Sequence, residues 1–210
     1  MSTLFVNNLN TASGSTITVP TGKTIIGTDI GSIKAPGTPI QVVHTTIQTH
    51  PQYSSTSYVA TDVEVAITPK FADSKFLLEA VYSGGTNAGN SNSHDCMAAL
   101  NFRDSLNPSG ANAAIVTDNA SGAGTLRTGG FMLLPSTAAV ASVLRYWVHQ
   151  IPMQFLYTPS YQNTNTRTFG VLIKVGDSSQ GTTQNMSDTN ANDRRDIRGS
   201  CTIKVTEIAQ

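Results

Sequence analysis

The chain has 210 residues, a formal net charge of +0 at pH 7, and only 12% charged residues. This charged share is about half of the ~25% that is usual for soluble domains. Because there is no basic excess, a broad nucleic-acid-binding surface is not expected. No stretch reaches the ~20 apolar residues that a membrane-spanning helix needs, so membrane insertion is not expected either.

A weakly charged surface also has little to keep monomers apart, since net charge normally does this in solution. Burial of the surface in an assembly would solve that problem. The length allows one domain of ordinary size plus a smaller segment. Met1–Asn8 has neither a basic start nor a long apolar run, so we expect no signal peptide and folding in a cytoplasm.

Residues 1–37 contain only short apolar clusters separated by turn-forming residues. Each cluster is too short to form a stable sheet by itself. Two interpretations remain open, a disordered tail or a stalk whose apolar residues are buried between sister copies along a shared axis. We predict the second, a trimeric docking stalk. Its candidate contact residues are Leu4, Phe5, Val6, Leu9, Ile17, Val19, Ile25 and Ile26.

The boundary of this segment is Ala35-Pro36-Gly37-Thr38-Pro39, because two prolines around a glycine stop regular structure on both sides. A second domain is therefore expected at residues 38–210. It begins with a predicted strand at Ile40–Gln48, in which Ile40 and Val42 share one face and Val43 and Ile47 share the other.

The clearest alternation in the chain is Val59–Ile67, where apolar residues occupy one register and Asp62 and Glu64 the other. A period of two predicts a strand with one face on a core. Pro69 ends this strand because it removes a backbone donor. The polar turn that follows belongs either to a hairpin or to a corner between two sheets, and it leads into a strand at Lys75–Tyr82.

Further strands are expected later in the chain, separated by two long polar loops at Gly84–Asp95 and Gly176–Arg198. Ser136–Tyr157 could start a helix at a Ser or Thr cap, but its flanks favour a strand from about Val143 to Phe155. The other predicted strands are Cys96–Arg103, Thr125–Leu134 with a glycine bulge, Thr166–Val175, and a closing strand from Cys201. These patterns predict an all-β chain, in which the short-stranded stalk precedes an antiparallel, jelly-roll-like β-sandwich.

Four short motifs follow one another along the chain: Gln41-Val42-Val43, Ile67-Thr68-Pro69, Ser74-Lys75 and Glu207-Ile208-Ala209. With their flanking residues they resemble a module of tail-fibre and other virion proteins of bacteriophages, of the marine phage and cyanophage type. The opening MSTLFVNNLNTASGSTITVPTGKTIIGTD is similar to the start of such proteins, where it precedes a knob. The likeness covers residues 1–82 and about 166–210 and is faint between them.

This resemblance implies a non-enzymatic virion protein that is made in the host cytoplasm. It implies a homotrimeric short tail fibre or spike-like appendage, docked through residues 1–37, with a β-sandwich knob at 38–210 that contacts the host surface. Its partners are then sister copies, other virion proteins of the tail or capsid, and a host surface glycan, and no cofactor is expected. Alternatives are a capsid decoration or cement protein, or a lectin-like glycan-binding module. The candidate recognition loop contains Asn87, Asn90, Asn92 and His94.

Catalytic and metal-binding patterns are weak. His94-Asp95-Cys96 has the residue types of a thiol nucleophile site, but neighbours in an extended chain point to opposite faces and cannot form a triad. His44 and His50 would share a face of an unbroken strand and could gather on a trimer axis around a metal, although exposed histidines are the simpler interpretation. Asp188–Asp193 starts like a calcium loop but lacks the required glycine and the closing glutamate.

Three other groups have structural explanations. The arginine-rich segment Arg194–Arg198 is either a mixed ion-pair patch at a subunit contact or a site for an anionic group. Cys96 and Cys201 are expected as small buried side chains, with a disulfide as the alternative. Four aromatic residues are expected in the core or in an interface, with sugar stacking as the alternative; they are Tyr146, Trp147, Tyr157 and Tyr161.

Overall fold

The computed structural model describes residues 21–22, 24–27, 29–30, 33–87, 96–116, 130–134, 148–175, 181–184 and 199–210. Within these ranges every regular element is a strand. No helix that is long and apolar enough to cross a membrane is found in them.

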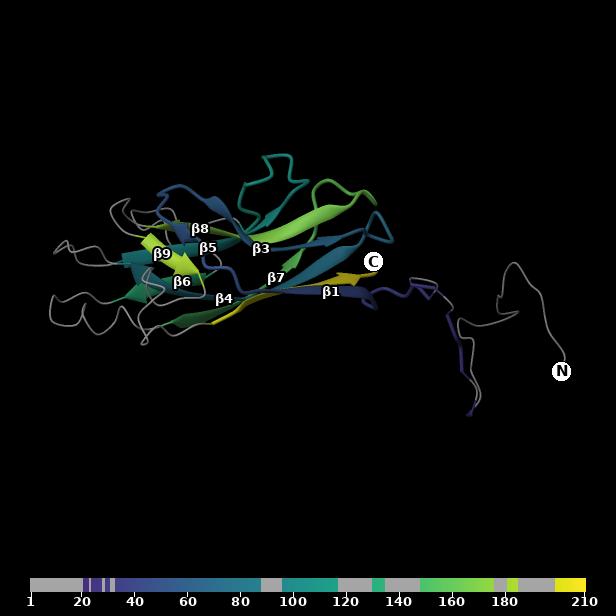
Figure 1. Ribbon diagram of the computed structural model, residues 1–210. Helices are drawn as coiled ribbons and strands as arrows, with labels where there is room; N and C mark the ends of the chain where they lie inside the picture. The colour runs from purple at the N-terminus through teal and green to yellow at the C-terminus, as the bar shows by residue number, and fades with distance from the viewer. Residues whose placement is uncertain are drawn as a thin grey trace.

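Ten strands make up the described part of the chain, and Figure 1 shows them in two layers. They are β1 (Pro39–Ile47), β2 (Gln52–Tyr53), β3 (Val59–Ile67), β4 (Lys75–Asn87), β5 (Cys96–Asp104), β6 (Gly130–Leu134), β7 (His149–Tyr157), β8 (Arg167–Val175), β9 (Gly181–Gln184) and β10 (Cys201–Ile208).

The two layers are antiparallel sheets. One sheet has six strands. Five of them follow the order β1-β10-β4-β9-β2, and the sixth, β7, also pairs with β4. The second has four strands in the order β3-β8-β5-β6. The predicted all-β sandwich is therefore confirmed.

The alternation of β3 behaves as predicted. Val63 and Val65 are buried, at 0% and 8% exposure, whereas Glu64 between them is exposed. β1 follows the same rule, since Val42 is exposed and Val43 packs against the core. In both strands the period of two decides which side chains meet the other sheet.

The turn after β3 is a corner between sheets and not a hairpin. β3 pairs with β8 in the four-stranded sheet, whereas β4 pairs with β10 and β7 in the six-stranded sheet. Residues 68–74 therefore carry the chain from one layer to the other. This resolves the two alternatives that the sequence left open for the segment.

Two predicted loops contain strand. β4 continues to Asn87, although a loop was predicted from Gly84, and β9 lies inside the predicted loop 176–198. Gly84–Asn87 pair with β9, and Gly84 also pairs with His149 of β7. These pairings rest on backbone hydrogen bonds, which leave no hydrophobic alternation in the sequence, so pattern reasoning misses them. The predicted strand residues 125–129 and 143–147 lie outside the described residues.

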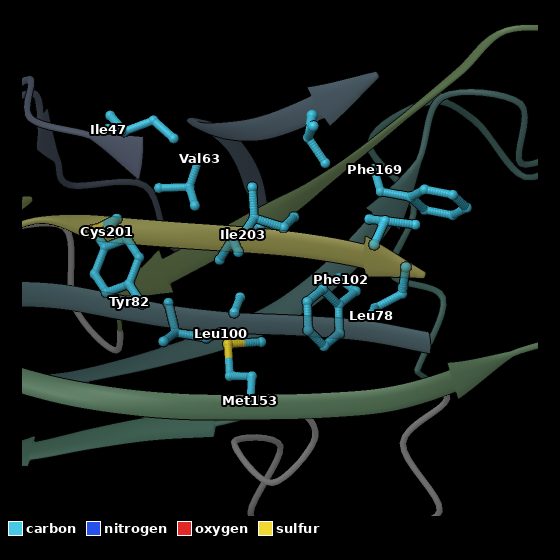
Figure 2. Close-up of a cluster of buried hydrophobic side chains, with 14 of the residues drawn as sticks. Ile47, Val63, Leu78, Tyr82, Leu100, Phe102, Met153, Phe169, Cys201 and Ile203 are labelled. Atoms are coloured by element: carbon cyan, nitrogen blue, oxygen red, sulfur yellow. The ribbon is translucent and has the colours of Figure 1, made fainter. Parts of the chain in front are cut away.

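The core fills the space between the sheets, as Figure 2 shows for Tyr82, Leu100, Met153 and Ile203 among others. Aromatic rings collect toward one end of it. Phe76 and Phe169 have ring centroids 5.0 Å apart, and Tyr157 meets Phe169 edge-on at 6.0 Å. Such tilted and edge-to-face pairs add about 0.5–1.5 kcal/mol each beyond their buried area.

The outer faces of the two sheets differ. The segment after β5 returns alongside β5, where Ala114 forms a backbone bridge with Arg103 and the Asn101 side-chain amide exchanges two hydrogen bonds with the backbone of Val116. Asn101 is only 1% exposed there, and its neighbour Leu172 is fully buried. The outer face of the six-stranded sheet instead carries exposed aliphatic side chains.

Candidate functional site: the junction between leader and sandwich

The junction is the end of the sandwich where β1 begins and β10 ends, and where the leader (residues 1–37) joins the body (Figure 1). The fully buried Glu207 of β10 lies at its centre and is the register partner of Gln41 in β1. It faces inward because it continues the register of Ile203 and Val205.

Four donors converge on the Glu207 carboxylate. Its Oε1 accepts from the backbone N–H groups of Lys70 and Phe71, at 2.8 and 3.2 Å, and from Ser74 Oγ at 2.6 Å. Its Oε2 accepts from Gln41 Nε2 at 2.6 Å. A buried carboxylate is costly unless hydrogen bonds replace water. Because every contact offers a hydrogen, the set suits an ionised carboxylate, which can only accept.

The four motifs of the sequence therefore meet in one cluster. Gln41 Nε2 also donates to the Thr68 carbonyl at 2.7 Å, so the motif that ends β3 takes part as well. Each motif supplies one member, and together they fix the corner between the sheets against β1 and β10. We call these five groups, Gln41, Thr68, the 70–71 amides, Ser74 and Glu207, the Glu207 cluster.

A buried ion pair lies beside this cluster. Arg167 Nη1 donates to Asp104 Oδ2 at 2.9 Å, and both side chains are 1% exposed. The other Arg167 amino group donates to the Tyr161 carbonyl at 3.0 Å, and the guanidinium carbon lies 5.3 Å from the Phe76 ring centroid. Burial, with a smaller contribution from Asp104, raises the pKa of Tyr157 to about 12. These contacts close the end of the core between the sheets.

Sequence reasoning missed both Arg167 and Asp104 as buried residues. The available signal was register, because Arg167 precedes Phe169 by two residues and Asp104 follows Phe102 by two. Each charged residue thus shares the inward face of its strand with buried phenylalanines. The same signal was available for Glu207.

The last residues of the leader are fastened to this junction. Gly37 N–H donates to the Ala209 carbonyl, and Ala209 N–H donates to the Thr38 carbonyl, both at 2.9 Å. Lys34 Nζ lies 3.1 Å from Asp73 Oδ2 and 4.5 Å from the Phe71 ring centroid. Phe71 and Asp73 belong to the same corner that Glu207 holds from the inside, so the cluster and the leader attach to one turn.

On the N-terminal side of residue 33, the described part of the leader extends away from the sandwich (Figure 1). Among the predicted stalk contacts, Ile25 is 63% exposed and Ile26 is 80% exposed. Ile30 and Ile33 are also exposed, at 59% and 48%. The other predicted contacts, from Leu4 to Val19, lie outside the described residues.

Asn87, the one described residue of the predicted recognition loop, lies at the opposite end of the sandwich from the leader (Figure 1). Asn87 is the last residue of β4, whose first residue is at the junction. Asn90, Asn92 and His94 lie outside the described residues. The strand direction alone therefore places the start of this loop at the far end from the leader (Figure 1).

The remaining candidates form no common site among the described residues. β1 ends at Ile47, before His50, so His44 and His50 do not share one unbroken strand. No group of three or more potential metal ligands is found among the described residues. Tyr157 is buried as expected and Tyr161 is 56% exposed. The other predicted groups, at 94–95, 146–147, 188–193 and 194–198, lie outside the described residues.

Cys201 is a free, fully buried thiol. It accepts a hydrogen bond from the Ser83 N–H at 3.2 Å. Burial raises the pKa of this thiol to about 12. The expectation of a small buried side chain is confirmed for Cys201, and the disulfide alternative does not hold for it.

No protein-family model matches the sequence, and no curated protein sequence matches it. A solved structure described as "Structure of infectious bursal disease virus Gx strain" is similar, with a TM-score of 0.29 and 12% sequence identity. The match covers 89% of this chain and 46% of the viral chain, so this chain spans about half the length of that protein. So loose a superposition does not identify a family.

Proposed function

We propose that the chain is a non-enzymatic structural protein of a phage virion, which forms a homotrimeric short tail fibre or spike-like appendage. The leader docks to the particle and the sandwich is the knob. The observation that carries this proposal is the leader itself, whose isoleucines stay exposed while its last residues are held firmly at the junction.

The exposed leader favours association for an energetic reason. Full burial of one isoleucine side chain contributes about 1.5–3 kcal/mol. Ile25, Ile26, Ile30 and Ile33 obtain little of this from their own sandwich, since each is about half exposed or more. Ordering the segment costs about 1–2 kcal/mol per residue in backbone entropy. Sister leaders and a socket on the particle supply the missing contacts in our proposal.

The two ends of the sandwich suit two different tasks. The junction end combines the Glu207 cluster, the Arg167–Asp104 pair and the leader attachment, so a pull on the leader is transmitted to β10 and to the corner between the sheets. The far end carries Asn87, the first residue of the predicted recognition loop. Docking through the leader would present that far end to the host surface, and the resemblance to tail-fibre modules supports the same orientation.

Immunogold labelling of purified particles from an infected culture, with antiserum against the full chain, tests the location. We expect a few gold particles per virion, clustered at the tail. Labelling in high number over the whole head would support the capsid-decoration alternative and contradict the fibre. Absence of label from purified virions would contradict a virion role altogether.

Host contact is tested separately. Deletion of Asn87–Asn92 should reduce adsorption of the particles without changing their yield. If adsorption is unchanged and a glycan array stays silent with the purified chain, contact of this knob with host glycan is ruled out, and the structural role remains.

A further inference from the structure

An apolar row crosses the outer face of the six-stranded sheet next to the junction. Val42, Thr206, Leu77 and Leu156 are successive register partners in β1, β10, β4 and β7. Partners in register point to the same face of a sheet. Val42 is 56% exposed and Leu156 is 54% exposed, at the two ends of the row.

A charged row runs parallel to it, two residues farther along each strand. It contains His44, Lys204, Glu79 and Gln154 in the same strand order. Lys204 Nζ and Glu79 Oε2 are 2.6 Å apart, with side chains 47% and 31% exposed. A shallow groove of about 470 Å³ lies here, lined in part by these two residues and Gln154. Lys75 shares the outward register of Leu77 and Glu79 on β4, so the two central strands carry Lys75, Glu79 and Lys204 on this face.

At Val42 and Leu156, which are 56% and 54% exposed, no described segment covers this face. On the other outer face Leu172 is fully buried, and the segment after β5 binds its register partner Asn101 through the backbone of Val116. Three of the four members of the row are aliphatic, and Thr206 between them is 9% exposed. Apolar side chains gathered on one face mark interaction sites more often than scattered single residues do.

We propose that a second copy of this chain packs against this face, around a symmetry axis parallel to the strands. The proposal rests on the function proposed above and specifies the surface through which the knobs meet. Such an axis keeps each row at the same height in every copy. The apolar row of one copy then meets the apolar row of the next, and Lys204 meets Glu79 of the next copy.

The leaders decide the direction of the axis. A rotation parallel to the strands keeps every junction at the same end, so that the leaders emerge side by side. An axis in the plane of the sheet and perpendicular to the strands would send them to opposite ends, where they could not share one docking point. In a trimer, the β1–β10 half of one face contacts the β4–β7 half of the next. The contact therefore joins two different patches, and the threefold rotation closes it into a ring.

The test uses the full chain and measures its sedimentation over a range of concentrations. Leu156→Glu places a desolvated charge in the contact, and we expect the midpoint concentration of assembly to rise at least tenfold. Ala66→Glu is the matched control, because Ala66 is an exposed β3 residue on the outer face of the four-stranded sheet. It should assemble like the wild type.

A charge exchange tests the pairing between copies. Lys204→Glu and Glu79→Lys should each weaken assembly alone, because each brings like charges together. An equimolar mixture of the two variants should recover much of the assembly, since the glutamate introduced into one copy then meets the lysine introduced into the next. This arm remains informative even if Leu156→Glu fails to fold.

Two outcomes are decisive. If Leu156→Glu assembles at the wild-type concentration and the mixture recovers nothing, the proposed face is wrong, while a wild-type trimer held by its leaders would leave the proposed function intact. If the wild-type chain itself stays monomeric throughout the concentration range, the proposed function is contradicted together with the face.

Discussion

Removal of the Glu207 carboxylate should destabilise the sandwich more than a typical substitution. Glu207→Ala leaves four donors without their acceptor at a fully buried position: the Gln41 amide, the Ser74 hydroxyl and two backbone N–H groups. An orphaned buried donor costs about 1–3 kcal/mol, although water entering the cavity recovers part of this. We expect a loss of about 3–5 kcal/mol in the free energy of unfolding, a large fraction of the ~5–15 kcal/mol available to a domain.

Glu207→Gln removes the negative charge of the side chain while nearly preserving its size and shape. Its carbonyl oxygen can still accept from the corner, but its amino group faces Gln41, which must turn its own oxygen inward and give up the Thr68 carbonyl. We expect a loss of about 1–2 kcal/mol, from one hydrogen bond and the loss of charge assistance. Asp73→Ala is the control on the same corner, where an exposed ion pair is worth at most about 1 kcal/mol.

The assay is equilibrium unfolding in urea, followed by far-ultraviolet circular dichroism at one fixed protein concentration, because assembly shifts apparent stability. The expected order of loss is Glu207→Ala, then Glu207→Gln, then Asp73→Ala. If Glu207→Ala lost less than about 1 kcal/mol, the four donors would have found other partners, and the account of the cluster as the node that holds the corner would be refuted.

Three further changes test the buried polar groups and the leader attachment. Asp104→Ala should cost about 3–5 kcal/mol because it leaves the Arg167 guanidinium buried without a counter-charge, and a loss below 1 kcal/mol in the same urea assay would contradict this. The unfolding free energy should fall as the pH rises from about 9 to 12, because the pKa of the Cys201 thiol is near 9 in the unfolded chain and about 12 in the folded one. Cys201→Ala should lessen that fall. An unchanged pH dependence in this variant would show that the thiol is not the source of the fall. Lys34→Ala should speed hydrogen exchange at Gly37 while global stability changes by less than about 1 kcal/mol, and unchanged exchange would show that Lys34 does not fasten the leader.

The sequence predicted the strands well wherever one face meets the core. β3 has its predicted bounds, β5 and β8 differ from theirs by one residue at one end, and β1 is shifted by one residue at both ends. In these strands hydrophobic alternation carries the information directly. β9 and the end of β4 could not be predicted this way, because glycine and threonine residues pair there through the backbone and leave no periodic signal.

The junction was predictable in part. The four motifs were recognised, but their meeting at Glu207 depends on a corner that brings residues 70–74 against residue 207, and only the three-dimensional fold specifies that contact. Inward-facing charges such as Arg167 were detectable from register alone. Their partners were not, since Asp104 lies 63 residues away along the chain.

Sedimentation of the full chain at micromolar concentration tests most directly the claim that the leader needs sister copies. The account predicts a species of three times the 22.2 kDa of one chain, which Ile25→Ser/Ile26→Ser shifts toward smaller mass while the circular dichroism of the sandwich is unchanged. A wild-type chain that sediments at 22.2 kDa, and whose leader amides are protected from hydrogen exchange in that monomer, would contradict it.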